Sequence, residues 1–409
     1  MRHRLILKII RRHPMHAFQG ITVLDLSQGI AGPVCAGILA RQGARVIKVE
    51  PLTGDWMRGI GNSREGMPAN AIAGNLNKEA LAIDAAKPAG REAILRLAAK
   101  VDVVVENFRA GVMTRLGLDF AALRAVNPRI IYASITGFGT IGPLAKKAAT
   151  DSVLQAYSGM AVANAVTNAQ GQQVPKRVGF YVPDNISAIY AAQAISAALY
   201  ERCRSGAGQH IQLSLAECCA AFQAGPLIDA LLFPPTAGQP ERVALAAPAG
   251  EFQTADGWVV VSCLSTEMFA RIAGAVGHEE WLIDPRFADN QLRAQHLSAI
   301  NAALGDALRH DSTADWVQRL EAADVLVSPI NDYATLRDDP QMQAMSYLAT
   351  VEQPPYGAVT VPHLPGADRT LRAAPRLGEH TRALLGESGL GDAAIDTLIA
   401  DGIAFQRKA

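Results

Sequence analysis

Apolar and polar positions follow two alternating patterns over the first third of the chain. Short, nearly continuous apolar runs that end in polar residues or glycine occur at 22–26, 44–50, 101–108 and 129–135. Segments with helical apolar spacing lie between them, at 31–42, 88–100 and 120–126. Strands that are apolar on both faces and alternate with helices are typical of a parallel sheet covered on both sides. We therefore predict an α/β fold with a doubly wound sheet.

Three polar segments with glycine follow the predicted strands, at 27–33, 106–111 and 136–143. Ligands of open α/β sheets bind beyond the carboxyl ends of the strands, so these segments are predicted to line one site. The last segment contains GFGTIG (137–142), which matches the dinucleotide-binding pattern GxGxxG. Because Pro143 follows and no apolar helical pattern begins there, we do not expect a helix that binds a dinucleotide phosphate.

Residues 184–204 are apolar or small on nearly every face until Glu201, which predicts a buried helix. Asp184 stands at its start, directly after Pro183. An aspartate there commonly caps the helix. The helix dipole and backbone N–H groups would also keep it ionised, and an ionised, oriented carboxylate can attack an activated carbonyl. Both roles stay open from the pattern alone, and Asp151 could likewise cap the helix that follows it.

The pattern changes from about residue 226. Residues 251–263 predict a hairpin with its turn at Asp256 and Gly257, and helical segments rich in alanine and charge follow over 267–323. Another helix is predicted within 375–390. The predicted domains are a disordered leader at 1–19, a large domain at 20–225, a smaller α+β domain at 226–345 and a C-terminal return to the large domain at 346–409.

Composition narrows the classes of partner. Lys plus Arg (38) equals Asp plus Glu (38), so we expect no nucleic-acid or membrane partner, and an anionic ligand would need a local site. No run approaches the ~20 apolar residues that span a membrane. The five cysteines form no CxxC pair and the nine histidines lack metal-ligand spacing, which predicts a cytoplasmic protein without a bound metal.

A resemblance becomes specific when the motifs are taken in order. From about Gly20 onward the chain resembles the family III CoA-transferases, the family of formyl-CoA transferase and carnitine CoA-transferase (CaiB/BaiF). The matching stretches include GITVLDLSQGIAGP, VDVVVENFRAGVMTRLGL, NPRIIYASITGFGTIGP and VPDNISAIYAAQAISAALYER. Their number and order carry the resemblance, which no single stretch would.

The resemblance implies a Rossmann-like large domain with a smaller domain, and a homodimer whose subunits interlock. Asp184 matches the family nucleophile, which attacks an acyl-CoA thioester to form an aspartyl mixed anhydride and then an aspartyl-CoA thioester. An acceptor carboxylate then takes the CoA. Coenzyme A is thus implied as a substrate, and no cofactor is implied to be permanently bound.

Family contacts to CoA carry over onto Asn107, Phe108, Arg115, Thr150 and Asp151. The resemblance gives Arg115 a role in binding phosphate. For Arg109 alone, an ordinary solvated loop is the simpler interpretation.

One departure concerns Ile30, where formyl-CoA transferase has a glutamine. An apolar side chain there counts against oxalate or formate as the substrate, so the acceptor pocket is expected to differ.

Two other functions remain open on the sequence. An α-methylacyl-CoA racemase needs two acid/base groups beside the substrate α-carbon, and racemases of this fold place a histidine before the aspartate that Asp151 matches. Thr150 stands there instead and cannot act as a base near neutral pH. A non-catalytic CoA-binding paralogue is the third possibility, although the presence of Asp184 argues against it. The sequence does not identify the donor and acceptor acids.

Overall fold

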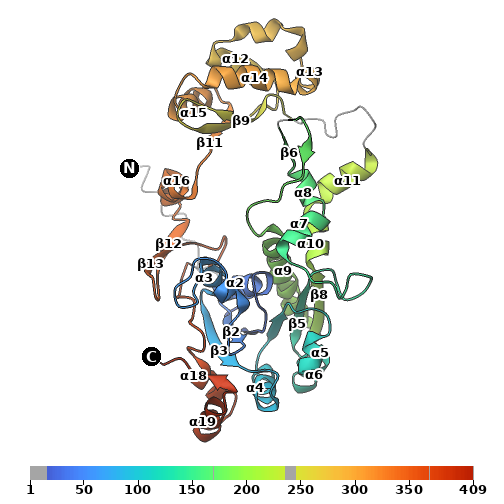
Figure 1. Ribbon diagram of the computed structural model, residues 1–409, viewed down its shortest axis with the longest axis vertical. Helices are drawn as coiled ribbons and strands as arrows, with labels where there is room; N and C mark the ends of the chain where they lie inside the picture. Colours follow the sequence, from blue (N-terminus) through green and yellow to red (C-terminus); the bar gives the residue numbers. More distant parts are fainter. Residues whose placement is uncertain (1–15, 169, 235–245, 368, 409) are drawn as a thin grey trace. The chain divides into compact units, whose positions relative to one another are not determined.

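The computed structural model describes residues 16–168, 170–234, 246–367 and 369–408. The chain divides into two compact units (Figure 1): one runs up to Leu227 and resumes at Tyr347, and the other spans Ile228–Ser346. Most of the predicted leader, residues 1–15, lies outside the described residues.

Within the described chain, the larger unit is built on a seven-stranded sheet in the order β14-β3-β2-β1-β4-β5-β8. The strands are β1 (Thr22–Asp25), β2 (Arg45–Glu50), β3 (Lys78–Ile83), β4 (Val103–Glu106), β5 (Ile131–Thr136), β8 (Gln209–Ser214) and β14 (Ala404–Phe405). All neighbouring strands from β3 to β8 pair in parallel, whereas β14 pairs antiparallel with β3. The fold is thus mixed α/β with a mainly parallel sheet.

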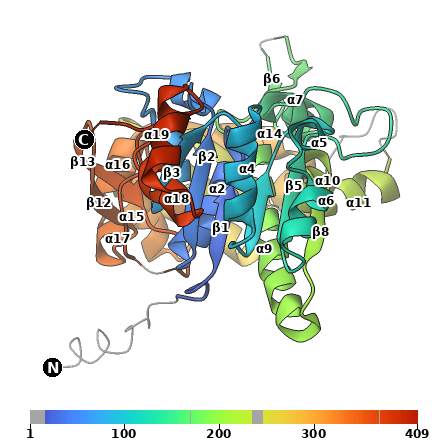
Figure 2. The ribbon, with the colours of Figure 1, turned by 90° about the horizontal axis from the view of Figure 1, so that it is seen from below.

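The two faces of this sheet bury different residues because successive side chains of a strand point to opposite sides. Val23, Val46 and Ile131 pack with helices α2 (Ala31–Arg41) and α9 (Val182–Ser205). Leu24, Ile47 and Val104 pack with α4 (Pro88–Ala98), α6 (Phe120–Val126), α18 (Thr381–Glu387) and α19 (Asp392–Ala400). Figures 1 and 2 show that α18, from near the C-terminus, lies beside β3. Each fully buried Leu, Ile or Val contributes about 1.5–3 kcal/mol.

The long helix α9 is buried on one side only. Ala188, Ala191 and Ile195 are fully buried, and the small side chains of the two alanines let the helix approach α2 closely. Ile189 and Tyr200 on other faces are 60% and 69% exposed. The prediction of a helix buried all round is therefore wrong for the single chain, because apolar residues also cover its outer face.

Helix α10 (Leu215–Phe222) follows β8 directly. The Ser214 side chain accepts a hydrogen bond from the Glu217 backbone N–H at 3.1 Å and so caps the helix. No single described helix is long and apolar enough to cross a membrane, although α10 and α11 (Ala224–Leu232), bent by 71° relative to each other, meet the length and composition test as a pair.

The smaller unit holds the antiparallel sheet β11-β10-β9. Its strands are β9 (Ala249–Gln253), β10 (Trp258–Ser262) and β11 (Leu326–Pro329). Gln253 pairs with Trp258, which confirms the predicted turn at Asp256 and Gly257. Helices α12 (Thr266–Val276), α14 (Leu297–Leu308) and α15 (Thr313–Ala322) form a core with the sheet around Phe269, Leu304 and Trp316.

Shorter elements complete the described chain. Those of the larger unit are η1 (Trp56–Gly59), α3 (Ala69–Asn75), α5 (Val112–Leu116), α7 (Asp151–Tyr157), α8 (Met160–Ala163), β6 (Val166–Thr167), β7 (Gln173–Val174), β12 (Leu348–Gln353) and β13 (Gly357–Pro362). Those of the smaller unit are η2 (Glu279–Ile283), η3 (Pro285–Phe287), α13 (Asn290–Gln295), α16 (Tyr333–Asp338) and α17 (Pro340–Ala344).

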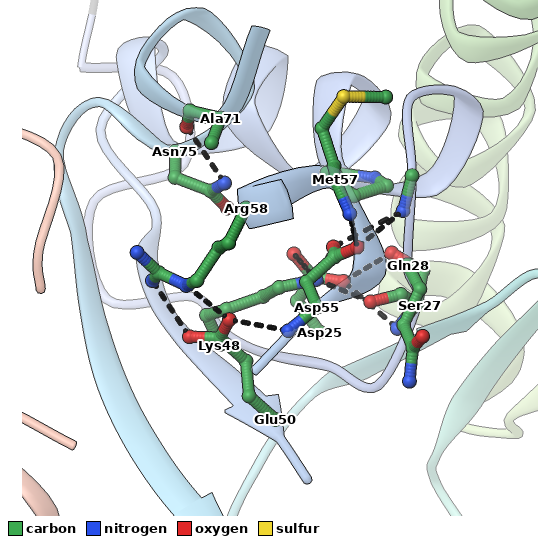
Figure 3. A network of polar contacts seen from close by, with 12 residues as sticks. Asp25, Ser27, Gln28, Lys48, Glu50, Asp55, Met57, Arg58, Ala71 and Asn75 are labelled. Carbon is green, nitrogen blue, oxygen red and sulfur yellow. Dashed lines mark hydrogen bonds and ion pairs between the residues drawn. The ribbon is translucent and has the colours of Figure 1, made fainter. Parts of the chain in front are cut away.

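A cluster of buried charges lies beneath the loop that follows β1 (Figure 3). Lys78 Nζ donates to Asp25 Oδ2 at 2.7 Å, and Lys48 Nζ donates to Asp55 Oδ2 at 3.1 Å. None of these four side chains is more than 4% exposed. Although burial opposes its ionisation, Lys48 and Lys78 hold the pKa of Asp25 below its ordinary value. We call Asp25, Lys48, Asp55 and Lys78 the buried charge cluster.

The buried charge cluster fixes the loop at residues 27–30. Asp55 accepts the Gly29 backbone N–H at 2.9 Å, and Asp25 accepts that of Ser27 at 3.1 Å. Gly29 has φ +80°, and a Cβ there would lie 2.4 Å from the Trp56 ring, so only glycine fits. Asn107, after β4, completes the support: it accepts the Gln28 N–H at 2.8 Å and donates to the Gln28 carbonyl at 2.6 Å.

We expect Asp25→Asn to destabilise the protein by about 3–5 kcal/mol, because Lys48 and Lys78 would lose a buried countercharge. Urea unfolding at pH 7 measures the change. The matched control is Asp338→Asn, whose partner Arg337 is 58% exposed, and it should change stability by less than about 1 kcal/mol. A change in Asp25→Asn as small as that of the control would contradict the structural importance of the cluster.

Candidate active site

Residues from all three predicted segments line a cavity of about 780 Å³ in the larger unit. They are Gln28, Ile30 and Ala31 after β1, Asn107, Phe108 and Arg109 after β4, and Gly137 after β5. The carboxyl ends of neighbouring parallel strands thus meet at one hollow, as their positions in the sequence predicted.

The glycine-rich segment GFGTIG contributes a loop and not a helix start. The next helix along the chain, α7, begins at Asp151. This agrees with the expectation that no dinucleotide-binding helix opens at the motif. Gly137 is needed for close packing, because a Cβ there would lie 2.2 Å from that of Ala149, another residue of the cavity wall.

Asp184 lines the cavity but does not cap its helix. Helix α9 begins at Val182, and its N-cap residue, Tyr181, makes no side-chain capping hydrogen bond. Asp151 likewise lies inside its helix: it is the first residue of α7, and Thr150 holds the N-cap position. The interpretation of the two aspartates as helix caps is therefore wrong. Both carboxylates remain available to the cavity.

The two aspartates are held side by side. Asp151 Oδ2 accepts the backbone N–H of Asp184 at 3.3 Å, and Asp151 Oδ1 accepts a hydrogen bond from Gln155 Nε2 at 2.7 Å. Gln155 is itself buried, and its Oε1 accepts the Val178 N–H at 2.8 Å. This chain of hydrogen bonds ties α7 to the segment before α9 and so fixes the spacing of the carboxylates.

This environment opposes ionisation of Asp184. Burial, with the negative charge of Asp151 second, raises the pKa of Asp184 to about 7. Burial also raises the pKa of Asp151. Burial and a like charge thus act against the expected ionisation of Asp184 at the start of the helix. A carboxylate that is weakly solvated and more basic than usual is a better nucleophile.

The structure brings together five of the six predicted site residues. Asn107, Phe108, Thr150, Asp151 and Asp184 all line the cavity. Arg115 does not: it lies exposed on the short helix α5, just beyond the loop that carries Phe108. Ile30, the position of the family glutamine, lines the cavity and is 7% exposed.

Sequence reasoning missed several residues of the cavity wall, among them Trp56, Met57, Gln155 and Arg177. Trp56 is 56% exposed at the start of η1, and such a tryptophan is a weak sign of a binding surface. Arg177 lies in a loop without periodicity. Its place seven residues before Asp184 is the only hint that the sequence offers.

The raised pKa of Asp184 predicts a pH-dependent effect of Asp184→Asn. Because the pKa is higher in the folded chain than the ordinary 3.8, ionisation of Asp184 lowers the stability of the wild type as pH rises from about 4 to about 7. Asn carries no such charge. The variant should be more stable than wild type by about 1–2 kcal/mol at pH 8, after allowance for partial exposure, and nearly equal at pH 4. Denaturant unfolding at both pH values checks this, and a wild type that is the more stable protein at pH 8 would contradict it.

Comparison with known proteins shows the family of this chain. The family model described as CoA-transferase family III matches residues 18–381. Acetyl-CoA:oxalate CoA-transferase from Acetobacter aceti is 34% identical over 341 residues, which cover 82% of this chain and 86% of the relative. Succinate–glutarate CoA-transferase from Agrobacterium fabrum is 32% identical over 390 residues, which cover 90% and 94%.

A solved structure gives the same result for the fold. A CaiB/BaiF family protein from Brucella suis has a TM-score of 0.80 and 32% identity to this chain, and the match covers 90% of this chain and 98% of that one. The ordered motifs, the fold and the relatives agree. This chain belongs to CoA-transferase family III and is an enzyme of the CoA-transferase class.

Proposed function

We propose that this enzyme moves CoA from an acyl-CoA donor to a free carboxylic acid, with Asp184 as the covalent nucleophile. The observation that carries the proposal is the Asp184 carboxylate in the cavity wall, next to Asp151, with its pKa raised to about 7. A protein that only binds CoA has no need of a destabilised carboxylate at that place.

The first half of the reaction loads CoA onto the enzyme. The ionised Asp184 carboxylate attacks the thioester carbonyl, the C–S bond breaks, and a mixed anhydride and a CoA thiolate result. The thiolate then attacks the aspartyl carbonyl of the anhydride. The donor acid leaves as a carboxylate, and Asp184 holds CoA as a thioester.

The second half reverses these steps with another acid. The acceptor carboxylate attacks the aspartyl thioester and releases the thiolate, which then attacks the acceptor's carbonyl carbon. The new acyl-CoA leaves and the Asp184 carboxylate is restored. Apolar wall residues such as Ile30, Met57 and Leu215 limit the access of water, which would otherwise hydrolyse the intermediates.

Asn107, Phe108, Thr150 and Asp151 are proposed to contact CoA near its sulfur end, since they line the same cavity as Asp184. Arg115 is proposed to bind a phosphate at the other end of CoA. CoA is a long molecule, so its nucleotide can reach beyond the cavity. An exposed guanidinium on α5 is free to pair with it.

The racemase alternative is not favoured. It would need a base at position 150, where the Thr150 hydroxyl instead forms a 3.1 Å hydrogen bond with that of Ser152.

Three broader expectations accompany this function. The strand order β3-β2-β1-β4-β5-β8 supports a Rossmann-like, doubly wound large domain. The free cysteines of the described chain support a location in the reducing cytoplasm. Cell fractionation can test this location. Exposed apolar side chains on α9 to α11, including Ile189, Tyr200 and Leu231, support a homodimer.

Asp184→Asn should lower the rate of CoA transfer by at least about 10⁴-fold, because an amide is too weak a nucleophile to open a thioester. Its affinity for CoA should change little. The matched control is Asp119→Asn: Asp119 caps α6 by accepting the Ala122 N–H at 3.0 Å, and asparagine caps about as well. Transfer in Asp184→Asn at the rate of the control would remove Asp184 from the mechanism.

Arg115→Ala should weaken CoA binding by about 1.5–3 kcal/mol through loss of a charged hydrogen bond. Titration calorimetry with CoA measures the change. Arg96→Ala is the control, since Arg96 pairs with Glu92 on the exposed face of α4. Equal affinity in both variants would show that Arg115 takes no part in binding.

The homodimer should be present at micromolar concentration in sedimentation velocity, because pairing would cover the exposed apolar faces of α9 to α11. A folded and active monomer under those conditions would show that a single chain suffices.

A further inference from the structure

Two acidic and two basic side chains line the cavity. Its wall includes the carboxylates of Asp151 and Asp184 and the guanidinium groups of Arg109 and Arg177. In the part of the chain that the structure describes, neither arginine forms an ion pair, whereas Arg45, Arg58 and Arg202 all do. Both side chains are exposed, so each can meet a ligand at the cavity.

The two arginines belong to different walls. Arg109 follows Asn107 and Phe108 in the loop after β4, where CoA contacts are proposed. Arg177 lies on the segment before α9, on the side of the two aspartates. Its positive charge is one of the influences that lower the pKa of Asp151, against the larger effect of burial.

Backbone hydrogen bonds hold Arg177 in place from both sides. The Lys176 N–H donates to the Ala161 carbonyl at 2.9 Å, and the Val178 N–H donates to Gln155 Oε1 at 2.8 Å. Gln155 also donates to Asp151 at 2.7 Å. The position of Arg177 is thus coupled to that of the carboxylate pair by the same amide that fixes Asp151.

Electrostatics indicates what Arg177 is for. An acid that enters beside Asp151 and Asp184 meets like charges, and its reacting carboxylate is consumed when it attacks the aspartyl thioester. A second carboxylate on the same molecule would add another negative charge beside Asp151 and Asp184. The exposed guanidinium of Arg177 offsets this repulsion, because its planar fork binds a carboxylate through two hydrogen bonds.

We infer that Arg177 binds the distal carboxylate of a dicarboxylic acid, so that the cavity selects short diacids over monoacids of the same size. This inference rests on the proposed CoA-transfer function, since it names the acid that the same site takes. Arg177 is then a specificity-determining residue and has no part in bond making.

Isotope exchange between an acyl-CoA and its own labelled acid tests the inference without knowledge of the natural donor. The matched pairs are succinate against succinamate, glutarate against glutaramate and adipate against adipamate, in which a neutral amide replaces the distal carboxylate. Wild type should exchange at least one diacid about 100-fold faster than its monoamide. Arg177→Gln should lower kcat/KM for that diacid about 10- to 100-fold and leave the monoamide unchanged within about 3-fold.

Two further variants separate recognition from structure. Arg177→Lys should restore part of the preference for diacids, since it restores the charge but not the fork. Arg109→Gln should keep the wild-type ratio of diacid to monoamide. An Arg177→Gln variant that slows both substrates alike would have only a structural defect, and this result would overturn the inference.

Intact-mass measurement of the enzyme–CoA thioester distinguishes this failure from that of the proposed function. Wild type that forms the thioester but exchanges diacids and monoamides equally would overturn the role of Arg177 alone. Wild type that forms no thioester with any of the acyl-CoA substrates would overturn both the proposed function and this inference.

Discussion

The candidate site depends on four charged side chains that are almost completely buried. Asp25, Lys48, Asp55 and Lys78 compensate one another beneath the loop at 27–30. A buried ion pair adds little net stability compared with apolar packing, but removal of one member is strongly destabilising. The cluster therefore acts chiefly as a constraint on geometry. It holds backbone N–H groups of the loop, and Asn107 then joins that loop to the next one.

Burial has a different effect at Asp151 and Asp184, which also line the cavity. There Asp151 and Asp184 lie close together without a lysine or arginine within ion-pair distance among the described residues. The buried charge cluster thus lowers the pKa of Asp25, whereas the cavity raises the pKa values of Asp151 and Asp184. Desolvation raises the pKa at both places, and only at Asp25 do buried lysines outweigh it. The same fold thereby separates carboxylates that hold the structure from carboxylates available for chemistry.

The sequence predicted the central strands well because strands buried on both faces are nearly continuously apolar. It gave no strand at β3, which begins with Lys78 and Glu79, since a buried and paired lysine looks like a surface residue in the pattern. The short edge strand β14, with two residues, is below what periodicity can detect.

For the site, the convergent ends of the parallel strands identified the loops, and the family resemblance identified Asp184. The position of Asp184 within its helix was predicted incorrectly. Pro183 and Asp184 mark a helix start, but the pattern could not tell a cap from the second and third helical positions that they occupy. Nor could it find Arg177, because a tertiary hydrogen bond from the next residue, Val178, to Gln155 places that segment.

The central claim is that Asp184 becomes covalently attached to the substrate. The most direct measurement incubates the wild-type enzyme with an acyl-CoA and no acceptor acid, treats it with hydroxylamine or borohydride, and maps the modified peptide by mass spectrometry. The account predicts modification of the peptide that contains Asp184 and of no other carboxylate. Modification at Asp151, or transfer activity without any modified aspartate, would contradict it.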